Sequence, residues 1–446
     1  MDQNPTHDDR FDPAGLTRRQ ALGLMGGALA FPWERLAAAE TPMAGAMPAA
    51  SPAPAAVPIA AASPPAPDLA NLHDTMAWIA REQAPRLSFL DPRWTSLDAW
   101  KQAARPVLRE RLSYEPKPEP LVAELVGREA RADFSVETVS ISATPAYRIP
   151  ARVLVPKGRR GRLPAVLALH CHGGRFTWGH EKVLSTPGEP AALTAYRNGL
   201  YGRPWAEALV RRGYVVIAID AFYFGERRLR VEELEATRVF GEVREAFDAT
   251  RTLPANPAEW TAAVNRVCSF YEHLTAKTLA AAGATWPGLH GWDDRRTVDY
   301  LLSRADVDPA RIGAVGLSGG GFRTAMLVGA DPRLKAAVVT GWMTEFASQL
   351  RNHARHTWMV YTPGLYPALD LPDVAALHAP GALLVQQCLR DTLYPVAGMR
   401  GAVEKLTRIY AKAGLPERFR GTFHDEPHSF TPRMQEEAFD WLDRWL

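Results

Sequence analysis

The stretch GAVGLSGGGF, residues Gly313–Phe322, places a single serine among glycines directly after an apolar segment. It contains the pattern G-x-S-x-G, and the residues that follow have the apolar spacing of a helix. A serine on a sharp strand-to-helix turn has strained backbone angles, and neighbours without a Cβ let the adjoining chains pass. The stretch therefore predicts that Ser318 stands on such a turn, with its hydroxyl lifted out of a sheet and beside the N–H groups of a helix.

Apolar and helical segments alternate along much of the chain. Segments that are apolar almost without a break, as parallel strands covered on both faces are, span 163–169, 214–219, 312–315, 336–340 and 382–385. Helical patterns span 69–81, 96–111, 205–212, 292–303, 321–328, 398–413 and 436–446. Two further segments, 134–141 and 148–155, fit hairpin partners at an antiparallel edge. This order predicts an α/β fold with a mostly parallel central sheet and helices on both faces.

The N-terminal part differs in composition from the rest of the chain. Arg18 and Arg19 precede the short apolar run 21–31, which predicts a twin-arginine export signal over residues 1–40. Ala and Pro dominate residues 41–67, which predicts an extended linker. From the signal we expect a periplasmic or secreted protein.

The remaining residues, 68–446, are expected to form one domain. It begins with a helical extension over 68–132. Residues 221–291 are too long for a simple crossover and contain a helical pattern near 257–282. We expect them to form an insertion over the carboxyl edge of the sheet, where ligands bind in open α/β folds.

The composition limits the kinds of partner. Lys and Arg number 52 against 49 Asp and Glu, a net charge of +3, which gives no case for a nucleic-acid partner. The run 21–31 is shorter than the roughly 20 apolar residues of a membrane span, so none is expected. The chain has an odd number of cysteines, Cys171, Cys268 and Cys388. At least one thiol is therefore free unless a disulfide joins two chains. The sequence leaves the oligomeric state open.

A serine hydroxyl is a weak nucleophile that needs a base, and a carboxylate orients the base. In the chain order serine, acid, histidine, the best base is His428, just before the last helical segment, and the alternative is His424. The best acid is Asp391, which follows an apolar strand, and the alternative is Glu345. The sequence therefore predicts a catalytic triad of Ser318, Asp391 and His428.

The segment HCHGG, residues 170–174, follows the predicted strand 163–169 and fits a loop that binds an oxyanion. The N–H of Gly319 is expected to be one donor to the oxyanion and the N–H of Gly174 the other. Further residues near strand ends are candidates for lining the substrate pocket, with ordinary packing as the alternative. These candidates are Arg175, Trp178, Tyr223, Phe224 and Trp342.

The same segment permits a metal site as an alternative. His170, His172 and His180 are imidazole ligands at short spacing. No carboxylate-rich partner segment accompanies them, and a glycine pair in this loop has the simpler use given above. We therefore expect no metal and no cofactor.

Together these motifs resemble the α/β-hydrolase superfamily, and within it the bacterial hydrolases like dienelactone hydrolase and acetyl xylan esterase. The matching segments are HCHGG, RGYVVIAIDAFYFGER, VDPARIGAVGLSGGGFRT, LLVQQCLRDTLYPV, HDEPHSF and WLDRWL, within 164–446. The resemblance implies a carboxylic-ester hydrolase with an acyl-enzyme intermediate, acting on acetyl or carbohydrate-linked esters among other candidates. Gly319 stands where acetyl-xylan and cephalosporin deacetylases have glutamine, and the cysteine-containing elbow of glucuronoyl esterases is absent, so the substrate stays open.

Two other functions share these motifs. A serine peptidase of the prolyl-oligopeptidase type has the same triad order, but residues 68–162 are too few for the propeller that usually accompanies it. An inactive hydrolase fold that serves as a binding module is the second alternative. Such modules usually lack a triad member, whereas this chain has a candidate for all three.

Overall fold

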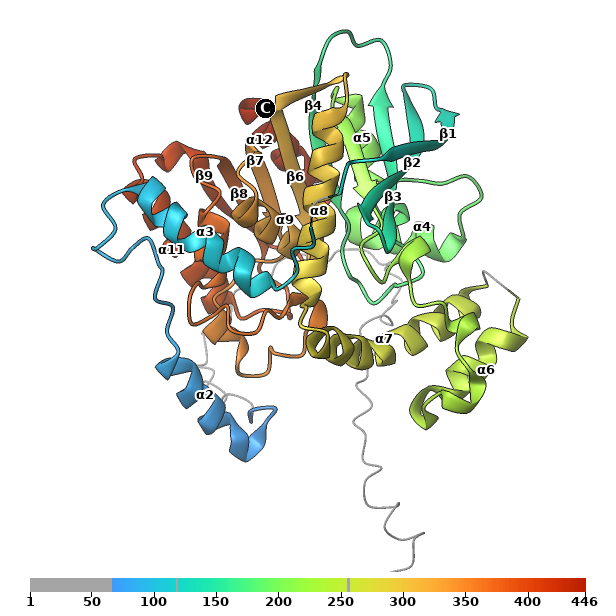
Figure 1. Ribbon diagram of the computed structural model, residues 1–446, viewed down its shortest axis with the longest axis horizontal. Coiled ribbons are helices and arrows are strands. Elements are labelled where there is room, and N and C mark those ends of the chain that lie inside the picture. The colour runs from blue at the N-terminus through green and yellow to red at the C-terminus, as the bar shows by residue number, and fades with distance from the viewer. Residues whose placement is uncertain (1–65, 118, 255–256) are drawn as a thin grey trace, which may run out of the picture. The chain divides into compact units, whose positions relative to one another are not determined.

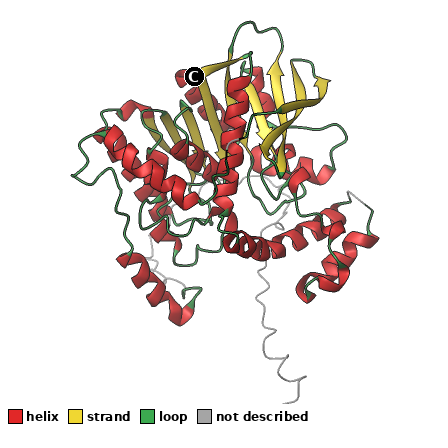
Figure 2. Cartoon of the chain, viewed as in Figure 1, coloured by secondary structure: helices red, strands yellow, loops and turns green. Residues whose placement is uncertain are grey.

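A nine-stranded sheet organises the computed structural model of this chain, which describes residues 66–117, 119–254 and 257–446 (Figures 1 and 2). The predicted export signal, and the predicted linker up to residue 65, lie outside the described residues. The strand order is β1-β2-β3-β5-β4-β6-β7-β8-β9. Strands β1, β2, β3 and β5 pair antiparallel, whereas β5, β4 and β6 to β9 pair parallel. This confirms the predicted mostly parallel sheet with an antiparallel edge.

The strands span β1 (Ala123–Ala130), β2 (Phe134–Thr144), β3 (Tyr147–Pro156), β4 (Leu163–Leu169), β5 (Val215–Ile219), β6 (Val307–Leu317), β7 (Ala336–Thr340), β8 (Ala382–Cys388) and β9 (Phe419–His424). The helices span α2 (His73–Glu82), α3 (Leu97–Leu112), α4 (Ala191–Tyr201), α5 (Trp205–Arg211), α6 (Arg244–Thr252), α7 (Ala258–Ala281), α8 (Trp286–Ser303), α9 (Gly319–Ala330), α10 (Leu371–Ala376), α11 (Val396–Lys412) and α12 (Pro432–Trp445).

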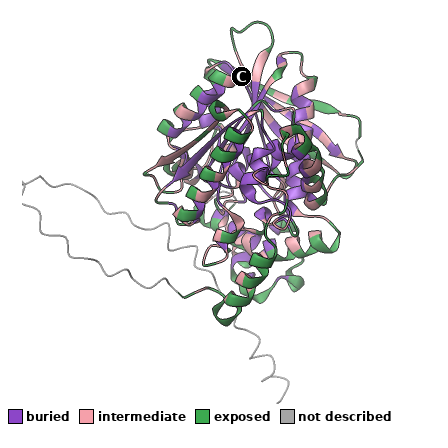
Figure 3. Cartoon of the chain, turned by 90° about the vertical axis from the view of Figure 1, so that its left-hand side faces the viewer, coloured by how far each residue is buried: buried purple, intermediate pink, exposed green. Residues whose placement is uncertain are grey.

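Helices cover both faces of the sheet, and the alternation of side chains along each strand builds two cores. On β4, Leu167 packs into the core shared with α3, α8, α9 and α11, whereas Val166 packs into the core shared with α5 and α12. Figure 3 shows the buried residues gathered along the sheet and the helix faces that meet it. Because both faces are buried, the inner strands are apolar without a break, as the sequence predicted.

The segment between β5 and α8 forms the predicted helical insertion. It contains α6 and the long helix α7, and its residues Phe224 and Val264 pack in a small core that also includes Trp286 at the start of α8. Figure 1 shows α7 running past the end of the sheet at which β6 ends. The carboxyl ends of the parallel strands lie at this edge.

Three boundaries differ from the sequence prediction. Residues 123–130, expected within a helical extension, form the edge strand β1, which is exposed and held by backbone pairing with β2 rather than by an apolar pattern. Helix α8 begins at Trp286, inside the expected insertion, because Thr285 caps it and accepts from Gly288 N at 3.0 Å. Strand β6 begins at Val307, before the apolar segment. No helix in the described part of the chain is both long and apolar enough to span a membrane.

Candidate active site

Ser318 occupies the turn between β6 and α9 with φ 59° and ψ −122°, a combination that costs a serine about 1–3 kcal/mol. Its N–H donates to Thr340 O on β7 at 2.9 Å, which ties the turn to the sheet. A Cβ on Gly316 would lie 2.2 Å from the carbonyl of Gly320, and a Cβ on Gly320 would lie 2.0 Å from Leu169 O on β4. The strained turn predicted from the sequence is therefore present, and close backbone approach requires both glycines.

A histidine and a carboxylate meet at the carboxyl end of the sheet. Asp391 follows β8, and His428 lies between β9 and α12. His428 Nδ1 lies 2.5 Å from Asp391 Oδ2, and Asp391 Oδ1 accepts from Leu393 N at 2.8 Å. The Asp391 side chain is fully buried, whereas that of His428 is 22% exposed. This pairing places the Nδ1 proton toward the carboxylate and leaves Nε2 free to accept a proton.

Strand β7 brings this pair to Ser318. Thr340 at its end accepts the Ser318 N–H, and a Cβ on the next residue, Gly341, would lie 3.3 Å from His428 Cε1. The serine and the imidazole therefore flank the same strand end. The described part of the chain contains no hydrogen bond between Ser318 Oγ and His428, and catalytic hydrogen bonds often tighten only with substrate.

The two alternatives for base and acid have other partners. His424 ends β9, and its Nε2 lies 3.0 Å from Glu437 Oε2 on α12. Glu345 lies against α11, where a Cβ on Gly401 would lie 2.8 Å from its carboxylate oxygen. Neither residue is hydrogen-bonded to a member of the predicted triad among the described contacts, whereas Asp391 and His428 are bonded to each other.

The loop after β4 approaches the helix N-terminus at Gly319, but not as the sequence predicted. Gly174 N donates to His172 Nδ1 at 3.0 Å, so this N–H is engaged and does not face an oxyanion. A Cβ on Gly319 would lie 3.2 Å from His172 N, which shows that the His172 backbone borders Gly319. Neither the His172 N–H nor the Gly319 N–H has an acceptor in the part of the chain described. The second candidate donor is therefore His172, not Gly174.

The three histidines of the metal alternative do not converge. His170 Nε2 accepts from Ala221 N at 3.2 Å, and burial lowers the pKa of His170 well below its usual value. His180 Nδ1 lies 2.7 Å from Asp220 Oδ1. The only metal-compatible group in the described residues is His180 with Asp220 and Glu226. Asp220 Oδ1 and Oδ2 already accept from the backbone N–H groups of His180 and Glu226, so hydrogen bonds within the loop explain this cluster.

The predicted pocket residues divide into two groups. Arg175, which is half-buried, lies over the Tyr196 ring at 5.9 Å, and Trp178 lies beside the same ring at 6.0 Å. Tyr223 instead belongs to the core of the insertion, with its hydroxyl donating to Cys268 O at 3.0 Å, and Phe224 belongs to the same core. Trp342 is buried against Phe322 and Tyr394. Ordinary packing accounts for the second group.

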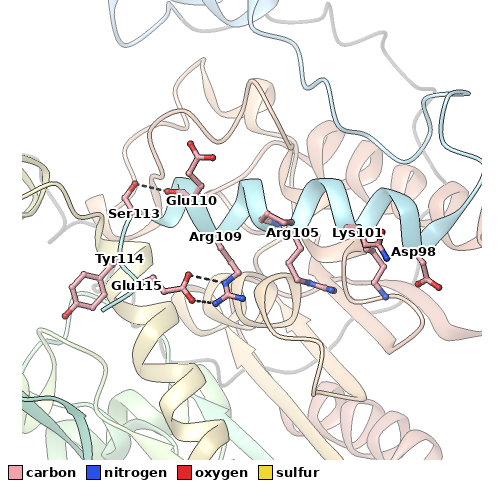
Figure 4. Close-up of a pocket in the computed structure, with 10 residues that line it drawn as sticks. Asp98, Lys101, Arg105, Arg109, Glu110, Ser113, Tyr114 and Glu115 are labelled. Carbon is pink, nitrogen blue, oxygen red and sulfur yellow. Dashed lines mark hydrogen bonds and ion pairs between the residues drawn. The ribbon is translucent and has the colours of Figure 1, made fainter. Parts of the chain in front are cut away.

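A large open pocket lies elsewhere, along α3 (Figure 4). Its volume is about 820 Å³, and its cationic side chains have structural partners. Arg105 donates to Gly329 O and Leu377 O at the ends of α9 and α10, and Lys101 donates to Ala379 O. None of its lining residues belongs to the loops that carry Ser318, Asp391 or His428. The volume of this pocket therefore does not identify it as the active site.

Two side chains that the sequence did not single out contact the loop after β4. Lys182 Nζ donates to Cys171 O at 3.0 Å and to His172 O at 2.9 Å. Glu272 Oε1 on α7 lies 2.9 Å from His172 Nε2. Neither belongs to a motif, and Glu272 is a hundred positions from its partner, so no sequence signal marked these residues.

Comparison with known proteins found one curated relative and many solved structures, and no family model matches the sequence. The curated relative is YtaP of Bacillus subtilis strain 168, named provisionally as a hydrolase, with 26% identity over 74% of this chain and 95% of its own length. A protein of Bacteroides fragilis, named provisionally as an acetyl xylan esterase, has a TM-score of 0.60 and 17% identity, covering 78% of this chain and 81% of its own. A glucuronoyl esterase of Solibacter usitatus has a TM-score of 0.54 and 16% identity over 78% and 94%.

These structural likenesses decide the architecture. The chain has the α/β-hydrolase fold. In α/β-hydrolases the nucleophile stands on the turn from strand to helix, and acid and base follow it in chain order. Ser318, Asp391 and His428 occupy these places here, on the turn after β6, after β8 and after β9. The fold thus accounts for why residues far apart in sequence meet at one edge of the sheet.

Proposed function

We propose that this protein is a serine carboxylic-ester hydrolase. The observation that carries the proposal is the His428–Asp391 pair at 2.5 Å beside a serine with a strained positive φ of 59°. An idle serine would relax into ordinary backbone angles, because strain of this kind persists only where the surrounding structure enforces it. The triad alone does not separate esters from amides, and the esterase neighbours favour esters.

In the proposed mechanism, Ser318 Oγ attacks the ester carbonyl carbon while His428 Nε2 takes the hydroxyl proton. Asp391 stabilises the imidazolium that forms. The carbonyl oxygen, now negative, accepts hydrogen bonds from the N–H of Gly319 at the N-terminus of α9 and from the N–H of His172 in the loop after β4. His428 then protonates the leaving alcohol, and water, with His428 again as base, releases the acid from Ser318.

We propose acetyl or carbohydrate-linked esters as the substrate class. The named activities of the neighbours in structure, acetyl xylan esterase and glucuronoyl esterase, support this choice. In this chain Arg175 directly follows the HCHGG segment and is half-buried, and its guanidinium can donate to sugar hydroxyls. Trp178 is buried beside Tyr196, with 7% of its surface exposed. We also propose export to the periplasm or beyond by the twin-arginine route, on the basis of Arg18 and Arg19 before the apolar run.

Steady-state hydrolysis of a substrate panel tests the function. The panel contains p-nitrophenyl acetate, acetylated xylo-oligosaccharides, a glucuronic acid methyl ester and a peptide anilide, each with the Ser318→Ala variant as control. We expect hydrolysis of at least one sugar ester by the unmodified chain and none above background by the variant. Cleavage of the anilide alone would point to a peptidase, and equal rates for both proteins would reject the serine mechanism. Replacing Arg18 and Arg19 by lysine should retain the protein in the cytoplasm.

A further inference from the structure

The imidazole of His172 links the oxyanion loop to the insertion. Its Nδ1 accepts from Gly174 N at 3.0 Å, so Nδ1 carries no proton and the ring hydrogen is on Nε2. Nε2 therefore donates to Glu272 Oε1, 2.9 Å away on α7. The imidazole ring is thus hydrogen-bonded at both nitrogens. Because Gly174 N can only donate, its hydrogen bond determines the tautomer of His172.

Glu272 holds a second segment at the same point. Its Oε1 also accepts from Thr357 Oγ1 at 2.6 Å, just before the short 3₁₀ helix Trp358–Val360. The carboxylate is buried, with 9% of the side chain exposed, so both hydrogen bonds are sheltered from water. A sheltered carboxylate with two donors positions its partners more firmly than a solvated one does.

The loop backbone is held from its other side by Lys182. This ammonium is fully buried, donates to the carbonyls of Cys171 and His172, and lies 4.3 Å from the centre of the Phe224 ring. Each carbonyl lies in one peptide plane with the N–H of the next residue, so the hydrogen bond to Cys171 O fixes the plane that contains the His172 N–H. The His172 N–H is thereby held by Lys182 through the Cys171 carbonyl, and the His172 side chain is held by Glu272.

We propose that Glu272 and Lys182 are positioning residues that keep the His172 N–H aimed, together with the Gly319 N–H, at the substrate oxyanion. This inference rests on the proposed hydrolase function and extends it. It gives α7 of the insertion a role in orienting a group that acts in catalysis, in addition to lying at the carboxyl edge of the sheet. Oxyanion donors act because they are oriented before the reaction, and a misplacement of about 1 Å lowers rates by roughly 10²-fold.

The test compares kcat and KM for Glu272→Ala, Glu272→Gln and the matched control Glu259→Ala, an exposed position on α7 with no hydrogen bond or ion pair among the described contacts. We expect Glu272→Ala to lower kcat by about 10–100-fold with KM nearly unchanged, because only the transition state uses the oxyanion donors. Glu272→Gln keeps an acceptor oxygen for the His172 Nε2–H and should restore most of kcat. Glu259→Ala should match the unmodified protein.

A second measurement covers the case in which Glu272→Ala does not fold. His172→Ala keeps the backbone N–H but loses the imidazole, and it should lower kcat by a similar factor. The double variant should then be no slower than either single variant, since both break one link. The inference would be overturned if Glu272→Ala had the same kcat as Glu259→Ala, or if it changed only KM. It would also be overturned if Glu272→Gln lost as much kcat as Glu272→Ala, or if the losses of kcat in the double variant were additive.

The design separates this inference from the proposed function. If the unmodified chain and Ser318→Ala hydrolyse no ester, the hydrolase function fails. If the unmodified chain is active through Ser318 and Glu272→Ala retains full kcat, only the positioning role fails. Binding of a boronic acid that mimics the tetrahedral intermediate gives an independent reading, since its Kd should rise in Glu272→Ala by about the factor that kcat/KM falls.

Discussion

The turn at Ser318, residues 316–320 and here called the elbow, borders the loop after β4, and each carries one of the two proposed oxyanion donors. The two regions are built in different ways. The elbow is fixed by close backbone contacts, between Gly316 and Gly320 within the turn and with the adjoining strands β4 and β7. The loop is fixed by side chains, with His172 held by Glu272 on α7 and by Lys182, ten residues further along the chain. One half of the site depends on backbone packing and the other on side-chain hydrogen bonds.

This difference decides what can be changed in each region. A turn packed backbone against backbone fails when a methyl group is added, because the neighbouring backbone has no room to move. A loop held by side chains tolerates small backbone changes but depends on groups that lie outside any motif. The predictions below test this contrast, beginning with the largest expected effect.

Ser318→Ala removes the nucleophile and should lower kcat by about 10⁴-fold or more. Since Ser318 has φ 59°, Ser318→Gly should lower kcat equally but raise the free energy of unfolding by about 1 kcal/mol, because glycine relieves the strain. Activity assays and urea unfolding measure the two effects. A Ser318→Gly variant that is no more stable than Ser318→Ala would contradict the strained elbow.

Gly320→Ala and Gly319→Ala form a matched pair on the elbow. A Cβ on Gly320 would lie 2.0 Å from Leu169 O, whereas a Cβ on Gly319 would lie 3.2 Å from His172 N. We expect Gly320→Ala to lower the free energy of unfolding by about 3 kcal/mol and Gly319→Ala by no more than about 1 kcal/mol. Urea unfolding of both variants measures these free energies. Equal losses of unfolding free energy would show that the backbone around Gly320 has room for a methyl group.

Lys182 supplies a pH test of the loop. Burial lowers the pKa of Lys182 to about 8 from an ordinary value of 10.5, so between these values the folded state binds fewer protons than the unfolded state. The contribution of Lys182 to the free energy of unfolding therefore rises with pH in this window.

The excess stability of the unmodified protein over Lys182→Met should accordingly rise by about 1–3 kcal/mol between pH 7.5 and 10. Urea unfolding across this range measures it, with Lys277→Met on the exposed side of α7 as the control. A difference that does not change with pH would show that burial does not lower the pKa of Lys182 in the folded chain.

The smallest effect is expected at Gly174. A Cβ there meets no atom within 4 Å, so Gly174→Ala bears only the strain of φ 64°, about 1 kcal/mol, and should keep kcat within about threefold. Its neighbour is the contrast, since a Cβ on Gly173 would lie 1.8 Å from Tyr196 Oη. Gly173→Ala should lower both stability and kcat more. The reverse order would place the oxyanion donor back at Gly174.

The sequence predicted most of the fold because the inner strands are apolar on both faces. Strands β4 and β7 coincide with their predicted bounds. Strand β1 was missed because an exposed edge strand needs no apolar alternation. Within the site, the glycines around Ser318 predicted the strand-to-helix turn. The structure pairs Asp391 with His428, as the chain order predicted.

The parts that the sequence could not supply depend on tertiary contacts. Which N–H of the HCHGG loop is free follows from a hydrogen bond between Gly174 and the His172 ring, and the spacing of glycines does not encode it. Tyr223 and Trp342 lie near strand ends, as pocket residues do, but aromatic packing buries them in cores. Lys182 and Glu272 meet the loop only after the chain has folded.

The most direct test of the central claim is covalent labelling of the folded protein by a fluorophosphonate, with peptide mass spectrometry to locate the adduct. An activated serine forms this adduct only when its base and oxyanion donors are in place. We predict an adduct on Ser318 that is absent in Ser318→Ala and strongly reduced in His428→Ala. A folded protein that carries no adduct, or one labelled at another residue, would contradict the account.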